Sequence, residues 1–402
     1  MLNPFSLMAV LYVTVGVFFA ALRSVMDLPG AFGPSNLNWL RVHVITVGTI
    51  LQLVFATLPT LARRKLGVEV RSPRQTWLQW ALVNAGFVLV VTGIVGTDSW
   101  TATIGATVIW VAVWLLLSAM VRAYRAAGRP WRESLRFYAT APAFLLVGIY
   151  AAVSLVLNLW APGGRVGNLE AHVHANVWGF LALIVAGTIF DLFPALTGTP
   201  MARPNWIRTT YWLITAGATG LVVGPWLNVN SMTLGGLGIY FVGTGLLLLN
   251  LVLTLVARRS ATPAALHLTL SYLWMVVPAF FAPFILLAPN LVNAPAVETA
   301  ATQGLINGWV MGMVMGAVPR LLRTKGWRAD SSLFSDSNYA ADGCWLTVAA
   351  LNLGVAIVWS AALVSPEEAR FHTIVGYGLI VVAWVPFLRR IWSSLVQTVE
   401  SF

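Results

Sequence analysis

Long apolar runs recur along almost the whole chain, and they limit its fold more than any other feature. A helix rises about 1.5 Å per residue, and the hydrocarbon core of a bilayer is about 30 Å thick. Twelve runs approach or exceed the length that this requires, at roughly 7–27, 39–61, 77–97, 100–121, 137–159, 171–193, 208–227, 233–256, 266–288, 299–318, 343–363 and 372–393. The sequence therefore predicts an all-α polytopic membrane protein with twelve transmembrane helices, in one membrane domain over residues 1–402.

The composition agrees with this class and argues against others. The chain is 58% hydrophobic and 9% charged, whereas soluble domains contain about 25% charged residues. The net charge of +11 does not indicate nucleic-acid binding, because the basic residues occur in short loops between apolar runs. The single cysteine, Cys344, excludes an internal disulfide, a Cys-x-x-Cys-His haem attachment and an iron–sulfur cluster. Any cofactor must therefore be held by other side chains.

The distribution of Lys and Arg predicts the orientation of the chain. Cytoplasmic loops of membrane proteins carry the excess of these residues. With both termini cytoplasmic, 20 of the 24 Lys and Arg fall on the cytoplasmic side, and Arg23, Arg41, Arg165 and Arg370 lie outside. One missed or added helix would scramble this segregation. We therefore predict a multi-pass protein of the inner or plasma membrane with cytoplasmic N and C termini.

Four of the five histidines lie near the outer ends of predicted helices. His43 opens the run 39–61, His172 and His174 open 171–193, and His372 opens 372–393, whereas His267 lies at a cytoplasmic end. Imidazole is the commonest metal ligand in proteins, and an ionisable residue in a membrane segment indicates a functional site. On a helix, His172 and His174 project roughly 200° apart. They therefore cannot easily chelate one ion together, but they can serve two different partners.

An internal repeat connects these positions. His43, His174 and Gln303 are separated by 131 and 129 residues, and a glycine follows each of them five positions later. Each segment then reaches a proline before a cytoplasmic loop, and the glycines and prolines are Gly48, Gly179, Gly308, Pro59, Pro194 and Pro319. This pattern predicts three four-helix units, built around 39–61, 171–193 and 299–318 in a pseudo-threefold arrangement. Each glycine lets a macrocycle or a neighbouring helix approach closely.

This layout resembles the catalytic subunit of the haem-copper oxidase superfamily, which includes oxygen reductases and nitric oxide reductases. The NnrS-type haem- and copper-containing membrane proteins are similar in size and layout. The resemblance implies that His43 and one of His172 and His174 are axial ligands of one haem, and that the other histidine of the pair faces a second metal or haem. It implies one or two b-type haems, with copper left open, a small diatomic ligand (nitric oxide or oxygen) and an electron-donor protein on the outer face.

The sequence also departs from that superfamily. Its His-x-His pair lies on the tenth helix, whereas here the pair is on the sixth, and the tenth offers Thr302, Gln303 and Asn307. The seventh predicted helix contains no histidine for a copper site. Two haems and a copper would take about six imidazoles, and the outer leaflet holds four. No predicted helix carries a carboxylate or lysine near its middle, the nearest being Asp191. Neither a complete oxidase site nor proton pumping is therefore expected.

Charged residues near the histidines suggest supporting roles. Arg41 and Arg370 each lie two residues before a histidine, and guanidinium groups there could bind haem propionates. The alternative is that they anchor the helices at the membrane interface. His372 is a further candidate metal ligand. Glu170 could orient a ligating imidazole, or it could stabilise the first turn of its helix.

The sequence thus predicts a membrane haem protein that binds or reduces nitric oxide or oxygen, or transfers electrons, without settling whether it is an oxidoreductase. Two alternatives stay open. The chain could be a twelve-span secondary transporter with a histidine-lined site, since internal repeats are common among carriers. It could also be a non-catalytic membrane subunit of a redox complex. The haem type, the presence of copper, the electron donor and the partner of each histidine in the pair are left open.

Overall fold

The computed structural model describes residues 3–25, 34–128, 133–258, 261–323, 344–361 and 364–400. Within these ranges all regular elements are helices and no strand occurs. Nine of these helices are long and apolar enough to cross a membrane: Pro4–Leu22, Trp39–Leu66, Pro73–Val95, Ser99–Ala127, Ser134–Val156, Gly164–Thr197, Asn230–Ala257, Pro263–Leu287 and Glu368–Ser393. The prediction of an all-helical, multi-pass protein in a lipid bilayer is thus confirmed. Positions 26, 27, 343, 362 and 363 of the predicted spans, and Arg259, lie outside the described residues.

The other three predicted spans are also helical, but their helices are not both long enough and apolar enough to count among those nine. The run 208–227 forms α9 (Trp206–Leu227). The run 299–318 lies within α13 (Ala294–Gln303), η5 (Gly304–Val310) and α14 (Met311–Arg323). The run 343–363 forms the short helix α15 (Trp345–Ser360).

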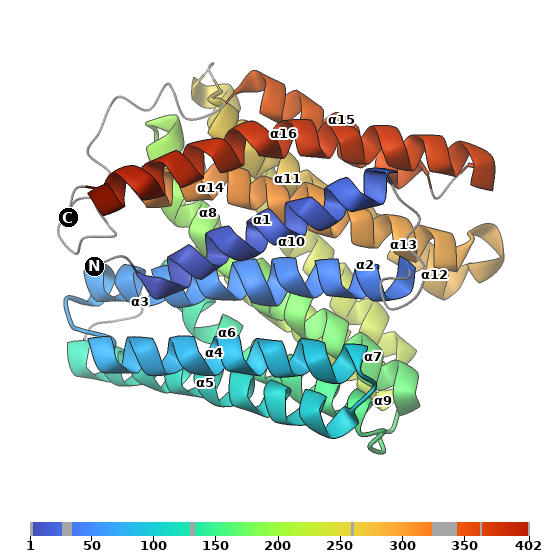
Figure 1. Ribbon diagram of the computed structural model, residues 1–402, viewed down its shortest axis with the longest axis horizontal. Coiled ribbons are helices and arrows are strands. Elements are labelled where there is room, and N and C mark those ends of the chain that lie inside the picture. The colour runs from blue at the N-terminus through green and yellow to red at the C-terminus, as the bar shows by residue number, and fades with distance from the viewer. Residues whose placement is uncertain are drawn as a thin grey trace. The chain divides into compact units, whose positions relative to one another are not determined.

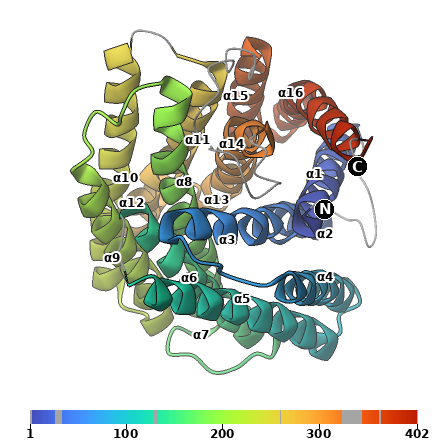
Figure 2. The same cartoon turned by 90° about the vertical axis from the view of Figure 1, so that its left-hand side faces the viewer.

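The chain forms two compact units. The first comprises Met1–Ile50, Leu192–Ala202 and Leu251–Phe402. Besides α13, η5, α14 and α15 it holds most of η2 (Val44–Leu51) and α1 (Pro4–Val25), α2 (Pro34–His43), α11 (Pro263–Phe280), α12 (Ala282–Leu287), η4 (Pro289–Leu291) and α16 (Pro366–Glu400). Within this unit, α16 packs along both α15 and α1 (Figure 2).

The second unit comprises Leu51–Asp191 and Arg203–Asn250. Besides α9 it holds α3 (Gln52–Leu66), α4 (Pro73–Val95), α5 (Ser99–Ala127), α6 (Glu133–Val156), α7 (Gly164–His174), η3 (Ala175–Leu181), and most of α8 (Ala182–Thr197) and α10 (Asn230–Arg258). Helices α4 and α5 lie side by side as an antiparallel hairpin (Figure 1). Helix α6 packs on α5 and α7, and α7 packs on α9.

Capping residues set several helix ends. Ser72 precedes α4 and forms a capping box with Gln75, in which each side chain accepts a hydrogen bond from the other residue's backbone N–H. The carboxylate of Asp98 accepts hydrogen bonds from the first backbone N–H groups of α5. Gly67 and Gly128, with φ of +75° and +56°, end α3 and α5 in the left-handed conformation that glycine adopts without strain.

Three of the long helices contain a π-helical segment, and each segment begins directly after a repeat position. η2 follows His43, η3 follows His174 and η5 follows Gln303. Such wider turns are rare and frequently occur at functional sites. The glycine in each segment packs against an aromatic residue of the preceding long helix, in the pairs Gly48 with Tyr12, Gly179 with Phe144 and Gly308 with Trp274. At all three glycines the close approach is therefore made by a neighbouring helix.

The last two helices of each predicted four-helix unit also share one contact. A Cβ atom at Gly86, Gly217 or Gly354 would collide with the fourth helix of its unit, at Ile109, Tyr240 and Ile380 respectively. Gly86 and Gly217 are 131 residues apart, the same separation as His43 and His174. Small residues allow such close helix packing in membranes. The contacts recur in all three predicted units, and the repeat itself stays a prediction.

Substituting Gly93 tests this packing. A Cβ there would overlap the backbone of α5 at Ala102, which cannot turn aside. We expect Gly93→Ala to lower the free energy of unfolding by about 1–3 kcal/mol, the usual cost of overpacking. Gly235→Ala in α10 is the control, because a Cβ there meets nothing within 4 Å, and alanine is favoured over glycine in a helix by roughly 0.5–1 kcal/mol. Thermal unfolding of both variants in detergent checks this, and equal melting temperatures would contradict it.

Candidate functional site

His43 is the last residue of α2, and a backbone carbonyl holds its ring. Its Nδ1 lies 2.8 Å from the carbonyl oxygen of Trp39. The indole of Trp39 stacks on the imidazole, with ring centroids 4.1 Å apart and planes inclined by 24°. Because a carbonyl only accepts hydrogen bonds, Nδ1 carries the hydrogen, and the neutral ring keeps a lone pair on Nε2. That tautomer binds a metal through Nε2.

His172 has the same arrangement with a different helix. Its Nδ1 lies 2.9 Å from the carbonyl oxygen of Gly148 on α6 and 3.1 Å from Nδ2 of Asn176. Asn176, one turn along, donates through Nδ2 to the carbonyl of His172 over 2.8 Å. A side chain at Gly148 would collide with Asn176, so glycine is what lets the α6 backbone come close enough to accept this hydrogen bond.

His174 turns away from its neighbour in the pair, as the helical spacing predicts. Its Nδ1 donates to the carbonyl oxygen of Leu221 on α9 over 2.7 Å, whereas His172 bonds to α6. Both rings are partly buried, and Val173 between them is exposed. The two imidazoles therefore face different neighbours, and each has its Nδ1 tied to a backbone carbonyl.

Glu170 takes neither of the two roles suggested by the sequence. Its Oε2 lies 3.3 Å from Nε2 of His174, not from the Nδ1 that a supporting carboxylate would hold. It also lies beyond the first turn of α7, which begins at Gly164. Leu221 instead provides the orienting acceptor. The side chain of Glu170 is 40% exposed, so it has room to leave the imidazole.

The remaining two histidines differ from each other. His372 lies in α16, and its Nδ1 is 3.0 Å from Oγ of Ser360. That hydroxyl donates to the carbonyl of Ile357, so it accepts from His372, which again keeps its lone pair on Nε2. His267 is 2% exposed, and its Nε2 lies 3.1 Å from the hydroxyl of Thr347. That hydroxyl donates to Cys344, so His267 carries its hydrogen on Nε2.

Arg41 lies within the first unit, away from any rim. It is 1% exposed, and its guanidinium donates to the phenol oxygen of Tyr377 and, over 2.8 Å, to Oε1 of Gln303. Tyr377 and Asn307 also donate to that same oxygen, over 2.7 and 3.1 Å. All these partners are neutral, and among the described residues Nε of Arg41 has no hydrogen-bond partner. Isolated buried charge is costly, so this arrangement favours an anionic group beside Arg41.

The predicted residues are divided between the two compact units. His43, Arg41 and His372 belong to the first unit, and His172 and His174 belong to the second. A haem shared by His43 and the pair stays a prediction. Arg370 is exposed on α16, as expected of an interface anchor. Within the described ranges, no three His, Cys, Asp or Glu side chains lie close enough to hold a metal ion by themselves.

Comparison with known proteins does not assign this chain to a family. No protein-family model matches this chain, and no curated protein is significantly similar to it. The likeness to the haem-copper oxidase superfamily therefore rests on the sequence pattern described above.

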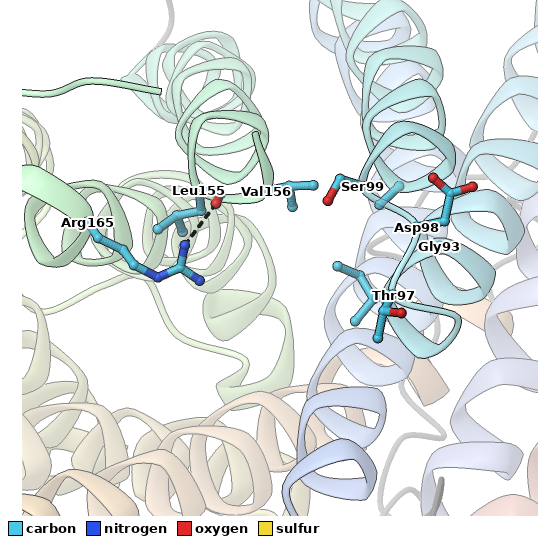
Figure 3. Close-up of a pocket in the computed structure, with 9 residues that line it drawn as sticks. Gly93, Thr97, Asp98, Ser99, Leu155, Val156 and Arg165 are labelled. Carbon is cyan, nitrogen blue, oxygen red and sulfur yellow. Dashed lines mark hydrogen bonds between the residues drawn. The ribbon is translucent and has the colours of Figure 1, made fainter. Parts of the chain in front are cut away.

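A pocket of about 280 Å³ lies elsewhere in the second unit, at the turn between α4 and α5 (Figure 3). None of the histidines lines it. Its walls come from that turn, from the end of α6 and from Arg165 at the start of α7. This pocket is therefore separate from the histidines of the candidate site.

Sequence reasoning missed the groups that fix the histidine rings. The acceptors for the pair are the carbonyls of Gly148 and Leu221, and no sequence pattern marks a carbonyl on another helix. Tyr377 was missed as well, although it follows His372 by five residues in the same helix. The sequence contains one signal of the π-helical turns, which is the glycine five residues after each repeat position.

Proposed function

We propose that this chain is an integral membrane protein that binds b-type haem through its histidines, and that it binds or reduces a small diatomic molecule or transfers electrons. His43 and one of His172 and His174 are the proposed axial ligands of one haem, the other histidine of the pair faces a second metal or haem, and His372 is a further candidate ligand. Nitric oxide is the favoured ligand, with oxygen next. Copper is left open.

One observation carries this proposal. In all four candidate histidines, Nδ1 lies within hydrogen-bond distance of an oxygen of the protein, and three times this oxygen is a backbone carbonyl. Metal-binding histidines usually have such a partner, because it fixes the tautomer and the ring orientation. His267, which the sequence did not suggest as a ligand, has the opposite tautomer. The π-helical turns after His43 and His174 add support.

The donor set fits a haem better than a bare metal ion. A haem brings four nitrogen ligands of its own, so the protein needs to supply only one or two imidazoles to each iron. His174 can bind iron only if Glu170 moves from its Nε2, and the exposure of Glu170 permits that. The buried guanidinium of Arg41 is suited to the carboxylates of a haem through charge-assisted hydrogen bonds.

The residues of this chain have clear roles in such a site. When bound, the haem supplies an iron centre that exchanges electrons and binds diatomic molecules. The carbonyls of Trp39, Gly148 and Leu221 hold the imidazoles at fixed angles and raise their basicity. The apolar helices keep bulk water out, which tunes the potential of the iron.

The finer topology belongs to the same proposal. We infer that α9, the helix formed by α13, η5 and α14, and α15 also cross the bilayer, giving twelve spans in three four-helix units. We also infer an inner or plasma membrane location with both termini cytoplasmic, because this orientation puts 20 of the 24 Lys and Arg inside.

The test is an absorption spectrum of the protein purified after expression with ample haem, in oxidised and reduced forms, together with iron and copper analysis. We expect a Soret band, a b-type spectrum after extraction into alkaline pyridine, and a shift of the reduced bands on adding nitric oxide. A preparation without a Soret band ends the haem proposal. A metal-free protein that transports a solute in liposomes would favour the transporter, and a metal-free protein in a tight complex would favour the non-catalytic subunit.

A further inference from the structure

The carboxylate of Glu170 and the imidazole of His174 face each other on α7. They are four residues apart in the sequence, which places them on the same side of the helix. Oε2 of Glu170 lies 3.3 Å from Nε2 of His174, and the two side chains are 40% and 16% exposed. One helix therefore brings an oxygen and a nitrogen ligand atom to the same point.

The tautomer of His174 determines what can lie at that point. Its Nδ1 donates to the carbonyl oxygen of Leu221 over 2.7 Å, so the neutral ring has a lone pair on Nε2. An ionised carboxylate also presents only lone pairs. Two such atoms repel each other unless a cation lies between them, and this cation is either a proton or a metal ion.

The distance between the two atoms favours a metal ion. A charge-assisted hydrogen bond between nitrogen and oxygen is about 2.7–2.9 Å long, which is shorter than the 3.3 Å between Glu170 and His174. Zinc binds an imidazole nitrogen at about 2.0–2.1 Å and a carboxylate oxygen at about 2.0–2.2 Å. In a tetrahedral site, these bond lengths separate neighbouring ligand atoms by about 3.3–3.5 Å. The observed separation is that of two ligands of one tetrahedral ion.

The surroundings of Glu170 also favour a cation. In the part of the chain that the structure describes, no Lys or Arg forms an ion pair with this carboxylate. Glu170 lies six residues after Gly164, where α7 begins, which is about 9 Å along the helix. Its partial exposure lets an ion reach it from that end. The carbonyl of Leu221 already supplies the second hydrogen-bond partner that metal-binding histidines usually have.

We propose that Glu170 and His174 together bind one divalent metal ion of the zinc type, with water in its remaining positions. Within the described ranges, no third His, Cys, Asp or Glu side chain is close enough to join them. The ion therefore keeps open positions, as the zinc sites of enzymes do. The metal site itself needs no haem. The pairing of His172 with His43 on the haem, which follows when His174 holds this ion, rests on the proposed function.

The test is a metal titration of the whole chain, purified in detergent without a histidine tag and freed of metal ions with a chelator. Competition with a chromophoric chelator measures the affinity for Zn²⁺. Co²⁺, which replaces zinc in such sites, reports the geometry through its visible absorption. We expect one ion per chain, competition between the two metals and the strong visible bands of tetrahedral Co²⁺. The absence of saturable binding, or the weak bands of octahedral Co²⁺, overturns the proposal.

Variants identify the two ligands. Glu170→Gln keeps the size of the side chain but removes its charge, and it should weaken Zn²⁺ binding about tenfold or more, because loss of a residue that only orients a ligand already costs 10–100-fold. His174→Ala should abolish the binding. Glu69→Gln and His267→Ala, which remove the same residue types elsewhere, are the controls and should leave the affinity unchanged.

The outcomes separate this site from the haem. Equal Zn²⁺ affinities in Glu170→Gln and Glu69→Gln, each with the circular dichroism of the parent, would show adventitious binding only and overturn the metal site. Zn²⁺ binding to a protein without a Soret band would refute the haem and leave the metal site standing. A Soret band in a protein that binds no Zn²⁺ would refute the metal site and leave the haem.

Discussion

Replacing His43 with alanine is expected to abolish any bis-histidine, low-spin haem spectrum and to lower the haem bound per protein about tenfold or more. Loss of a partner that only orients a metal ligand already costs roughly 10–100-fold in metal affinity, and here the ligand itself is removed. Absorption and electron paramagnetic resonance spectra of the purified variant, with haem quantified after extraction, provide the measurement.

The matched control is His267→Ala. His267 is also a buried histidine near a helix end, but it carries its hydrogen on Nε2 and bonds to Thr347, so its loss should leave the haem spectrum unchanged. His172→Ala and His174→Ala then rank the pair, because each ring is held by a different helix. An unaltered spectrum in His43→Ala would remove His43 from the site, whatever the other variants show.

Replacing Asp191 with asparagine is expected to lower the free energy of unfolding by about 1–4 kcal/mol, because its ion pair is partly buried and lies between exposed pairs, which contribute about 0–1 kcal/mol, and buried pairs, whose disruption costs about 3–5 kcal/mol. Asp191 on α8 lies 2.6 Å from Nζ of Lys65 on α3, and their side chains are 12% and 20% exposed. Tyr138 donates to the other carboxylate oxygen over 3.0 Å, and Ser134 accepts from Lys65. Without the carboxylate, a partly buried ammonium group would be left without a counter-charge.

Two further variants make this stability prediction specific. Glu69→Gln removes the partner of Arg63 in an ion pair whose carboxylate is 72% exposed, and exposed pairs contribute only about 0–1 kcal/mol. Lys65→Met combined with Asp191→Leu removes both charges and should recover much of the loss, because an apolar pair needs no counter-charge. Denaturant unfolding in detergent, followed by tryptophan fluorescence, measures all three. Equal losses in Asp191→Asn and Glu69→Gln would show that Asp191 has no special role.

The sequence predicted the helical class well, because long apolar runs have few other structures open to them in a bilayer. The sequence predicted membrane spans less clearly where a helix carries polar residues or is short. Helix α9 begins with Trp206 and Arg208 and contains several threonines, and α15 has only 16 residues. Whether these two helices cross the membrane depends on what they pack against, and periodicity and hydropathy carry no information about that packing.

The sequence suggested the residues of the candidate site from their type, but it did not predict the groups that surround them. The spacing of His172 and His174 correctly predicted that their rings face different neighbours, because the angle between them follows from helix geometry alone. The burial of Arg41 was not predicted. Its partners Gln303 and Tyr377 are more than 250 residues away in the chain, so only tertiary packing brings them to it. Glu170 was misjudged because its rotamer, which the sequence does not contain, points at Nε2.

The π-helical turns give these helices a property that straight α-helices lack. A π turn holds one residue more than an α turn, so the extra residue is taken up within the turn and the α-helical parts on either side keep their packing. The residue before the turn and the part of the helix beyond it can therefore change their relative orientation when the turn shifts. A shift of the wide turn by one position would re-aim His43 or His174 while the far half stayed in its packing, which is a way for a rigid membrane scaffold to adjust a ligand.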